Sequence, residues 1–408
     1  MSVNEAIYPC ADPLVELNLH IKFKHPWQCC HHVVEGSSGE GNVGPRVIIH
    51  CDLDAFFAAV ETLHHGFDED VPLIIGSDPK QGRGRGIVST CNYAARAYGI
   101  RSAMPVSEAW RRCPAAPFGP AMYIRGTRGL YSRASRKVMS VLSEAADIFE
   151  KASIDEAYLD VTEHVGGDWD TALALATNLQ QKIFETVNLT ASFGIAPTRL
   201  VAKMASEVNK PNGVFRVMPD EVQSFFGGRS LRDIPGIGPK RATQLAEWGY
   251  TTADELYELG ELSLARLSGE RFAAWFMRVV DGESSDVVSP LRSRKSIGKE
   301  HTFERDQNDH EEVMRRLEQL VSLVMERAVG LGVSGRLAEV KIRYTGFETH
   351  TSGRSIPVAM DEEGVFKRLA NILFATNIRP DSSVRLIGFR LGQLEIPASR
   401  QTTLFEEE

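Results

Sequence analysis

The sequence predicts an α+β protein of several domains, and three features support this prediction. With 408 residues, 43% of them hydrophobic, the chain can form about two to four domains with separate cores. Strand-like and helix-like segments alternate between Val47 and about Val217. Short helices joined by glycine turns follow from Leu231 to Tyr250, and from Ser296 the predicted order is strand, helix, strand, strand, helix, strand.

The composition limits the class of protein. No apolar run is long enough to span a membrane, and the N-terminus has no signal-peptide pattern, so we expect a cytoplasmic protein. The six cysteines are scattered over the N-terminal part of the chain, which argues against a disulfide framework. The net charge of −8 does not itself suggest a nucleic-acid partner, but residues 292–400 contain 18 Lys and Arg against 15 Asp and Glu.

Two acidic segments follow apolar, strand-like runs. Asp52 and Asp54 end the run that begins at Val47, and Asp155 and Glu156 lie in an alternating stretch further along the chain. Three carboxylates on neighbouring strands repel one another unless a divalent cation lies between them, and Mg²⁺ prefers oxygen ligands of this kind. Two such ions about 4 Å apart catalyse in-line phosphoryl transfer in polymerases and nucleases. Either segment alone is equally compatible with a strand end that carries solvated acids.

Two further segments contain side chains suited to phosphate groups. Residues 86–99 are predicted to be a strand that passes into a helix, where Tyr93 and Arg96 share one face and can reach the same ligand. A guanidinium beside a phenol fits triphosphate oxygens, although a surface arginine packed on a tyrosine gives the same pattern. In a later helix, ended by a Pro-Asn-Gly sequence, Lys203 lies among apolar residues. It therefore either has an anionic partner or extends its ammonium into solvent.

Two segments indicate contact with a nucleic-acid backbone. Gly236 and Gly238 form a tight Gly-x-Gly turn that opens a helix, with Lys240 just inside it. Backbone N–H groups at such a turn bind phosphate, which predicts a helix-hairpin-helix that holds DNA without reading its sequence. Residues 292–299 concentrate four cations at the start of the last predicted domain. Such a basic segment either follows a phosphate backbone or is simply solvated.

The two ends of the chain differ from the remainder. Residues 1–45 include a Gly- and Ser-rich linker, and the adjacent Cys29-Cys30-His31-His32 lack the spacing of zinc ligands. We therefore expect no metal site here, and either a disordered extension or a start codon assigned too early. The polar tail, 397–408, ends in a short motif whose apolar pair can bind a groove on a partner, although motifs of this length also arise by chance. The motif residues are Gln401, Leu404 and Phe405.

Taken in order, these segments resemble the Y-family of translesion DNA polymerases, and among them the DinB or DNA polymerase IV type, from about Val47 to Leu394. The motifs that carry the resemblance are Asp-x-Asp-x-Phe-Phe-Ala-x-Val-Glu (52–61), Ser-Thr-x-Asn-Tyr-x-Ala-Arg (89–96), Arg-Ser-Ala-Met-Pro (101–105), Ser-Ile-Asp-Glu-Ala-Tyr-Leu-Asp (153–160), Ala-Lys (202–203), Lys-Pro-Asn-Gly (210–213), Pro-Gly-Ile-Gly (235–238) and Arg-Lys-Ser-Ile-Gly (294–298). Residues 1–45 fall outside it.

The resemblance implies the layout of a right-handed polymerase. Its expected regions are a palm at 46–55 and 126–211, fingers at 56–125, a helical thumb with the helix-hairpin-helix at 212–285, a linker at 286–293, a βαββαβ little finger at 294–396 and the tail at 397–408. The palm carries the catalytic residues, and the thumb and little finger hold DNA.

The resemblance also assigns the site residues. The catalytic and metal-binding residues are Asp52, Asp155 and Glu156, with the main-chain carbonyl of Leu53 as a further ligand of two Mg²⁺ ions. The nucleotide-binding residues are Phe56, Phe57, Thr90, Tyr93, Arg96 and Lys203, and Phe57 is the steric gate against the 2′ position of the sugar. The DNA contacts are Gly236, Gly238, Lys240, Arg294, Lys295 and Ser296, and the clamp contacts are Gln401, Leu404 and Phe405. Asp54 belongs to the motif without being assigned as a metal ligand.

The activity implied by the resemblance is that of a monomeric DNA-directed DNA polymerase that copies damaged templates with low fidelity, a nucleotidyltransferase of DNA repair and replication with mutator character. Its expected partners are primer–template DNA, dNTP and a sliding clamp. One Mg²⁺ activates the primer 3′-hydroxyl, and the second offsets charge on the departing pyrophosphate. No segment resembles a proofreading exonuclease, and small residues such as Gly99, Ser102 and Ala103 suggest a loosely enclosed base pair.

Two other classes remain open from the residues alone. Nucleotide cyclases also carry acidic pairs on a palm-like sheet, but they do not need the predicted hairpin or the C-terminal sheet domain. A non-catalytic scaffold that binds DNA and a clamp does not need three candidate metal carboxylates.

Overall fold

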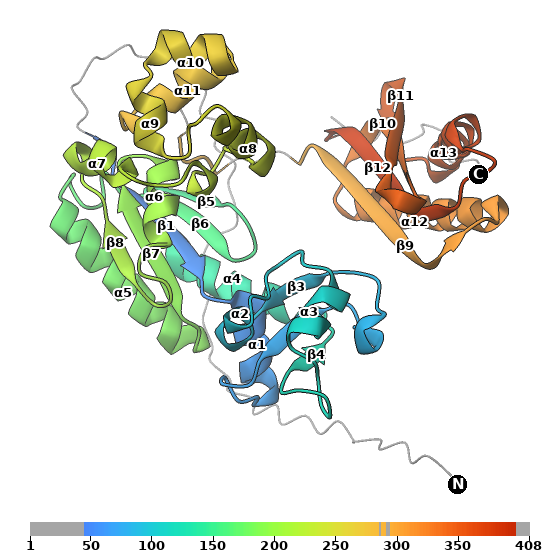
Figure 1. The fold of residues 1–408 in the computed structure, drawn as a ribbon, viewed down its shortest axis with the longest axis horizontal. Coiled ribbons are helices and arrows are strands. Elements are labelled where there is room, and N and C mark those ends of the chain that lie inside the picture. The colour runs from blue at the N-terminus through green and yellow to red at the C-terminus, as the bar shows by residue number, and fades with distance from the viewer. Residues whose placement is uncertain (1–44, 285–286, 291–293, 397–408) are drawn as a thin grey trace, which may run out of the picture. The chain divides into compact units, whose positions relative to one another are not determined.

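A computed structural model describes residues 45–284, 287–290 and 294–396, and all structural statements concern these residues (Figure 1). The predicted N-terminal extension with Cys29–His32, and the tail with Gln401, Leu404 and Phe405, lie outside the described residues. Within the described part, no helix combines the length and the apolar character needed to cross a membrane.

A five-stranded sheet forms the palm region and carries both acidic segments. Its strand order is β5–β6–β1–β7–β8, with β1 (Ile48–Leu53) in the centre. The other strands are β5 (Ile148–Lys151), β6 (Glu156–Asp160), β7 (Ala191–Ala196) and β8 (Val214–Arg216). β1 is antiparallel to both of its neighbours, and β7 and β8 are parallel. Every residue of β1 is buried, which explains its long apolar run.

The palm sheet extends beyond the predicted boundary at residue 211. β8 pairs with β7, although it follows the Lys-Pro-Asn-Gly segment and lies within the range expected for the thumb. The physical reason is that residues 210–213 form a turn that returns the chain to the edge of the sheet, where the Phe193 N–H donates a hydrogen bond to the Gly213 carbonyl oxygen at 2.8 Å. The first thumb elements follow only after β8.

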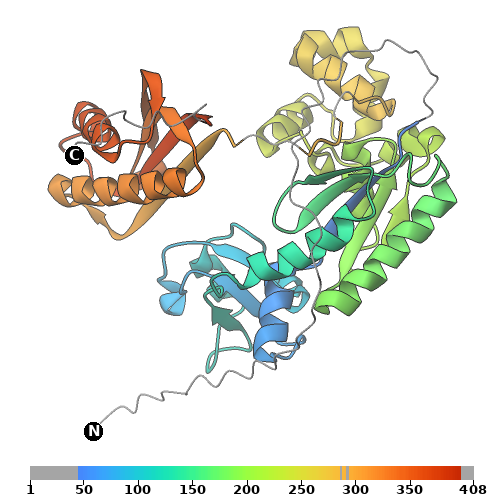
Figure 2. The same cartoon turned by 180° about the vertical axis from the view of Figure 1, so that it is seen from behind.

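Helices cover both faces of the palm sheet. α4 (Leu130–Ser143) and α5 (Trp169–Val187) pack on the face to which Ile49, Cys51 and Leu53 contribute their side chains. Side chains alternate along a strand, so His50 and Asp52 point to the opposite face. That face is covered in part by α6 (Arg199–Ser206). Figure 2, seen from behind, shows α4 and α5 side by side on the near side of the sheet.

The position of α6 depends on a glycine in β7. A Cβ atom at Gly194 would lie 2.0 Å from the carbonyl oxygen of Ala202 and 2.3 Å from the amide nitrogen of Ser206. The backbone of α6 therefore rests directly on β7 at this residue, and no side chain fits between them. Because His50 pairs with Gly194 in the sheet, this close packing brings the last turn of α6 over the centre of β1.

The fingers region contains a small three-stranded sheet of order β3–β2–β4. β2 and β3 are antiparallel, and β2 and β4 are parallel. The elements in chain order are α1 (Phe56–His65), β2 (Leu73–Gly76), the 3₁₀ turn η1 (Lys80–Gly82), β3 (Val88–Cys91), α2 (Tyr93–Ala97), α3 (Val106–Arg112) and β4 (Met122–Ile124). The predicted passage of a strand into a helix before Gly99 is confirmed by β3 and α2.

The thumb region is helical throughout its described part. Its elements are η2 (Pro219–Glu221), α7 (Val222–Phe226), η3 (Leu231–Asp233), α8 (Pro239–Glu247), α9 (Ala253–Glu258), α10 (Glu261–Ser268) and α11 (Glu270–Val280). Phe226 and Phe276 are among the largest fully buried side chains, and their cluster also contains apolar residues of α6. The change to short helices joined by glycine turns is thus confirmed.

The little-finger region has the predicted βαββαβ order. Its sheet, β11–β10–β12–β9, is antiparallel throughout, and the core lies between the sheet and two helices. The elements are β9 (Ser296–Gln307), α12 (His310–Gly330), β10 (Ser334–Tyr344), η4 (Thr345–Phe347), β11 (Thr349–Met360), α13 (Glu363–Asn377) and β12 (Val384–Glu395). β11 is exposed along most of its length, so it lacks the apolar alternation that marks a half-buried strand.

Candidate active site

The two acidic segments meet at the end of β1. Asp52 and Glu156 are directly paired in the register of β1 and β6. The Lys210 ammonium lies 2.8 Å from an Asp52 carboxylate oxygen, and the Lys203 ammonium lies 2.6 Å from Glu156 Oε1. Each of the two carboxylates therefore contacts the ammonium group of a lysine.

The charges in this site are strongly coupled. Burial raises the pKa of Asp52 to about 7, although the Lys210 ammonium opposes this shift. His50 and the Lys203 ammonium hold the pKa of Glu156 well below its usual range. The His50 ring is fully buried, with Nδ1 2.8 Å from Ser206 Oγ and Nε2 3.9 Å from a Glu156 oxygen. Two acids this close can both be ionised only when cations stand beside them.

Asp155 lies next to the pair, but its carboxylate is turned to another partner. The Ser153 hydroxyl donates a hydrogen bond to Asp155, and the Asp155 carbonyl accepts one from the Leu53 N–H at 3.1 Å. In the described ranges, no three His, Cys, Asp or Glu side chains converge on one point as metal ligands do. The oxygen donors still fit a hard divalent cation, since Asp52 and Glu156 are paired across two strands and Asp155 is the residue directly before Glu156.

Asp54 has a structural role. One of its carboxylate oxygens accepts a hydrogen bond from Ser192 Oγ at 2.8 Å, and the other accepts one from the Asn212 N–H at 2.8 Å. Its own N–H donates to the Thr190 carbonyl at 3.0 Å. The side chain thereby ties the end of β1 to β7 and to the turn at 210–213, which holds Lys210 beside Asp52.

Tyr93 and Arg96, two of the predicted nucleotide-binding residues, lie on the fingers side of this site. The Arg96 guanidinium carbon is 4.6 Å from the centre of the Tyr93 ring, as expected for residues on one helical face. Arg96 has no ion-pair partner in the described ranges. Asn92 begins α2 by accepting hydrogen bonds from the N–H groups of Ala95 and Leu73, both at 3.0 Å.

Tyr93 is close to the acidic end of β1. It lines a pocket together with Asp54, Pro211 and Asn212, so the start of α2 lies beside the 210–213 turn. Burial raises the pKa of Tyr93, and the negative charge of Asp54 acts in the same direction. Thr90 is half-buried in β3, three residues before the first residue of α2. The pocket thus brings the first turn of α2 within electrostatic range of the carboxylates.

The two phenylalanines that open α1 have different environments. Phe56 is buried in the palm core, so only its main chain is available to a ligand. Phe57 is half-buried, and its ring stacks on the ring of Tyr131, with ring centres 4.1 Å apart and planes inclined by 12°. The Tyr131 hydroxyl is hydrogen-bonded to Glu61, whose side chain is fully buried. Phe57 therefore has a defined orientation at the edge of the site.

The Gly-x-Gly turn has the geometry of a backbone phosphate site. Gly236 has a φ of 104°, and a Cβ atom there would lie 2.7 Å from the Trp275 ring, so only glycine fits. Gly238 is the residue before α8, and no side chain caps the helix start. Lys240 is exposed in the first turn. Gly238 is exposed as well, so the start of α8 faces solvent.

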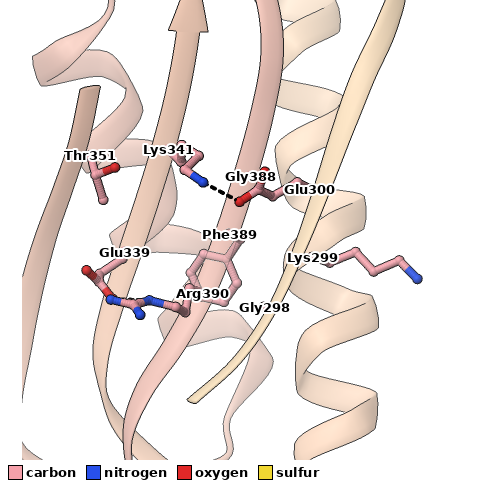
Figure 3. A pocket seen from close by; sticks show the side chains of 9 residues that line it. All are labelled: Gly298, Lys299, Glu300, Glu339, Lys341, Thr351, Gly388, Phe389 and Arg390. Atoms are coloured by element: carbon pink, nitrogen blue, oxygen red, sulfur yellow. Dashed lines mark hydrogen bonds and ion pairs between the residues drawn. The ribbon is translucent and has the colours of Figure 1, made fainter. Parts of the chain in front are cut away.

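The little-finger sheet presents a charged outer face. Figure 3 shows Lys341 bonded to Glu300 and Arg390 bonded to Glu339 on the face away from the helices, while Lys299 points away from this group. The Lys341 ammonium is 2.6 Å from the Glu300 carboxylate. The predicted DNA contacts Arg294 and Lys295 are exposed, and Ser296 begins β9.

Three residues of the site were missed by sequence reasoning. Lys210 was part of a recognised motif, and its position before Pro-Asn-Gly was a usable signal, but its contact with Asp52 depends on the fold of the turn. Tyr131 and His50 gave no signal of their own, because a tyrosine early in a helix and a histidine within an apolar strand are both common in cores.

Comparison with known proteins identifies the family. The model of the impB/mucB/samB family matches residues 51–207, and that of the C-terminal domain of the same family matches residues 294–404. A SAM-like helix-hairpin-helix tandem matches residues 228–269. The three matches follow one another in the order in which the structure places the palm sheet, the hairpin helices and the C-terminal sheet.

Curated relatives match over nearly their whole length. The DNA polymerase IV of Methanoculleus marisnigri is 38% identical over 367 residues, which is 89% of this chain and 98% of the relative. The DNA polymerase IV of Streptococcus gordonii is 35% identical over 350 residues, which is 86% of this chain and 97% of the relative.

Solved structures show the same fold. A Y-family DNA polymerase chimera of Dbh and Dpo4 has a TM-score of 0.76 at 28% identity, covering 86% of this chain and 99% of the other. The insertion ternary complex of Dbh DNA polymerase has a TM-score of 0.61 at 27% identity, covering 85% and 98%.

The chain belongs to the impB/mucB/samB family, the Y-family of DNA polymerases, and within it to the DinB or DNA polymerase IV type. It is a DNA-directed DNA polymerase for synthesis across damaged templates, with the low fidelity and the absence of proofreading that are general in this family. The predicted fold class and the helix-hairpin-helix are confirmed. The nucleotide cyclase and the non-catalytic scaffold are no longer needed as alternatives.

Proposed function

We propose that Asp52, Asp155 and Glu156, with the main-chain carbonyl of Leu53, hold two Mg²⁺ ions for nucleotidyl transfer. The observation that supports this is the contact of each of two aligned carboxylates with an ammonium group, at 2.8 Å for Asp52 and 2.6 Å for Glu156. Cations in this position are needed to keep both acids ionised in a partly buried site. When bound, the two ions lower the pKa of the attacking hydroxyl and neutralise charge on the leaving group.

The same lysines are candidates for the triphosphate. Once other cations stand beside the carboxylates, Lys203 and Lys210 can turn to phosphate oxygens, because both side chains remain partly exposed. Arg96 and the Tyr93 hydroxyl bind from the fingers side, where the guanidinium can contact two oxygens at once. Phosphates held from two sides are fixed in orientation, which aligns the α-phosphorus for in-line attack.

The remaining contacts concern the sugar, the DNA and the partner. Phe57 restricts space at the 2′ position, with Phe56 and Thr90 contributing to the nucleotide site. DNA backbone binds to Gly236, Gly238 and Lys240 and to Arg294, Lys295 and Ser296 through exposed N–H groups, cations and a hydroxyl. A sliding clamp binds Gln401, Leu404 and Phe405 of the tail. The enzyme works as a monomer in the cytoplasm.

Replacing single carboxylates tests the metal assignment. Asp155→Ala or Glu156→Ala should abolish primer extension with Mg²⁺ and reduce binding of Mn²⁺, measured by electron paramagnetic resonance without DNA. DNA affinity should stay close to that of the unmodified protein, because the thumb and little finger hold DNA. Glu185→Ala is a matched control, since this exposed glutamate bonds only to Gln181. Unchanged Mn²⁺ binding in both site variants would refute the assignment.

A further inference from the structure

The segment that leads into α4, together with its first three turns, carries an unusual concentration of cations. Arg125, Arg128, Arg133, Arg136 and Lys137, named here the α4 basic surface, are all exposed. No Asp or Glu occurs between Met122 and Ser143. None of the five cations has an ion-pair partner in the part of the chain that the structure describes. A chain with a net charge of −8 thus presents a cluster of uncompensated positive charge at this point.

Several exposed cations on other helices are paired with an acid of the same helix. Arg111 and Arg112 of α3 both contact Glu108, at 2.7 Å and 3.0 Å. Arg315 of α12 lies 2.9 Å from Glu312. These pairs follow the usual spacing of three or four residues along a helix. The sequence of α4 offers no acid at that spacing to any of its cations, so the difference is built into this helix.

The cations lie on the solvent side of α4. Val138, Met139 and Leu142 are buried against the palm sheet, on the side that Figure 2 shows covered by α4 and α5. Arg133, Arg136 and Lys137 lie on the opposite side, together with the exposed hydroxyls of Ser132 and Ser140. A helix segment from Arg133 to Ser140 is about 10 Å long, and one strand of B-form DNA presents about three phosphates over that length.

The two arginines before the helix extend this side toward its N-terminal end. Arg125 follows directly after β4, and Arg128 precedes Gly129, the residue before α4. The Arg133 guanidinium folds back toward Gly129 and comes within 3.4 Å of the position of a Cβ atom there. Tyr131, the second residue of α4, stacks on Phe57. The α4 basic surface therefore begins beside the nucleotide site.

We propose that the α4 basic surface binds the phosphate backbone of DNA, as a contact additional to those of the thumb and little finger. Arginine, lysine and serine are the side chains that contact phosphate in DNA complexes, and uncompensated cations gain most from replacing condensed counterions. No large apolar side chain of residues 125–143 is exposed, so the helix lacks the apolar face that a membrane surface requires. The inference rests on the proposed function, because it assumes that the protein binds primer–template DNA.

The salt dependence of DNA binding tests this proposal. The triple variant Arg133→Gln, Arg136→Gln, Lys137→Gln should bind a fluorescent primer–template more weakly at low salt. Its slope of log affinity against log salt should fall by about 2 to 3, since each lost phosphate contact contributes about 0.9. The matched control Arg111→Gln, Arg112→Gln, Arg315→Gln loses the same charge from paired cations and should keep the slope of the unmodified protein. Arg133→Lys with Arg136→Lys preserves the charge and should also keep it.

The outcomes separate this proposal from the proposed function. If the unmodified protein extends primers and the α4 triple variant shows an unchanged slope, the surface does not contact DNA and the proposal is overturned. An equal fall in the α4 variant and in the control also overturns it, because net charge alone would then explain the effect. Failure of the unmodified protein to extend primers would instead refute the proposed function. Gln is a good helix former, so the exposed substitutions should leave the thermal midpoint unchanged.

Discussion

The ring of Tyr131 lies almost parallel to the ring of Phe57, with ring centres 4.1 Å apart. Tyr131 is itself fixed, because its hydroxyl bonds to the buried carboxylate of Glu61. Glu61 also accepts hydrogen bonds from the Thr127 N–H at 2.6 Å and the Thr127 hydroxyl at 2.9 Å. The residue proposed as the sugar gate thus stacks on an aromatic ring that is held in place by a buried carboxylate of α1.

This support predicts a graded effect on sugar selection. Phe57→Ala opens space beside the 2′ carbon, so incorporation of ribonucleotides relative to deoxyribonucleotides should rise steeply. Tyr131→Ala leaves the gate ring in place but removes its support, so the same ratio should rise by a smaller factor. Single-nucleotide insertion with matched rNTP and dNTP measures both. The control is Phe118→Ala, which removes an exposed aromatic ring of the fingers region. A ratio unaffected by Phe57→Ala would make Phe57 a core aromatic without a gating role.

The order of the elements could be predicted from the sequence, but their contacts could not. The little-finger helices and strands have long, strongly periodic patterns, and their order was predicted correctly. The boundary of the palm was placed before β8, because a Pro-Asn-Gly turn looks the same whether it ends a domain or returns to a sheet edge. The contact of Lys210 with Asp52 could not be predicted from the motif that contains Lys210. It depends on the hydrogen bond from the Asn212 N–H to Asp54, which joins residues far apart in the sequence.

In the candidate site, too, the residue types could be predicted from the sequence but their contacts could not. The paired acids were recognised because carboxylates at strand ends are costly without a cation. That Glu156 lies beside Lys203, while Asp155 turns to Ser153, depends on the register of β6 and on the packing of α6. The close contact at Gly194, which fixes α6, has no counterpart in the local pattern, because a glycine in a strand can equally mark a bulge.

Glu61 should make a pH-dependent contribution to stability. Burial alone would raise its pKa, but the hydrogen bonds from Tyr131 and Thr127 outweigh this and leave the pKa below the usual 4.5. The stabilisation is therefore complete above pH 4.5 and is lost as the pH falls through the lower pKa of the folded state. Glu61→Gln should reduce the free energy of unfolding by about 2 kcal/mol at neutral pH.

Urea unfolding of both proteins over a pH series measures this effect. The difference between the unmodified protein and Glu61→Gln should stay constant from neutral pH to about pH 5 and shrink at lower pH. Glu144→Gln changes an exposed carboxylate at the end of α4 and should show little difference at any pH. A difference that grew on acidification would mean that the folded state raises the pKa of Glu61.

The packing of α6 on β7 predicts that Gly194 cannot be replaced. In Gly194→Ala the new methyl group would lie 2.0 Å from the Ala202 carbonyl oxygen, so α6 must move away from the sheet. We expect a loss of about 3 kcal/mol in the free energy of unfolding. Extension should fall further than stability explains, because α6 carries Lys203. Gly330→Ala, at the end of α12 with no atom within 4 Å of the new group, should be neutral or stabilising by up to about 1 kcal/mol. Equal stability of the two variants would contradict the close packing.

Deletion of residues 400–408 tests the proposed clamp contact. Leu404 and Phe405 lie eight residues or more beyond Ile396, the last described residue of the little finger. Burial of each side chain in a groove on the clamp would contribute about 1.5–3 kcal/mol. Ordering of the tail would cancel part of this gain, which leaves weak and transient binding.

The deletion should leave extension on a short primer unchanged, because neither the metal site nor the DNA contacts include the tail. It should remove the stimulation given by the sliding clamp of the host. Stimulation that survives the deletion would place the contact on the folded part of the chain, and then the exposed faces of the little finger would be the next surface to substitute.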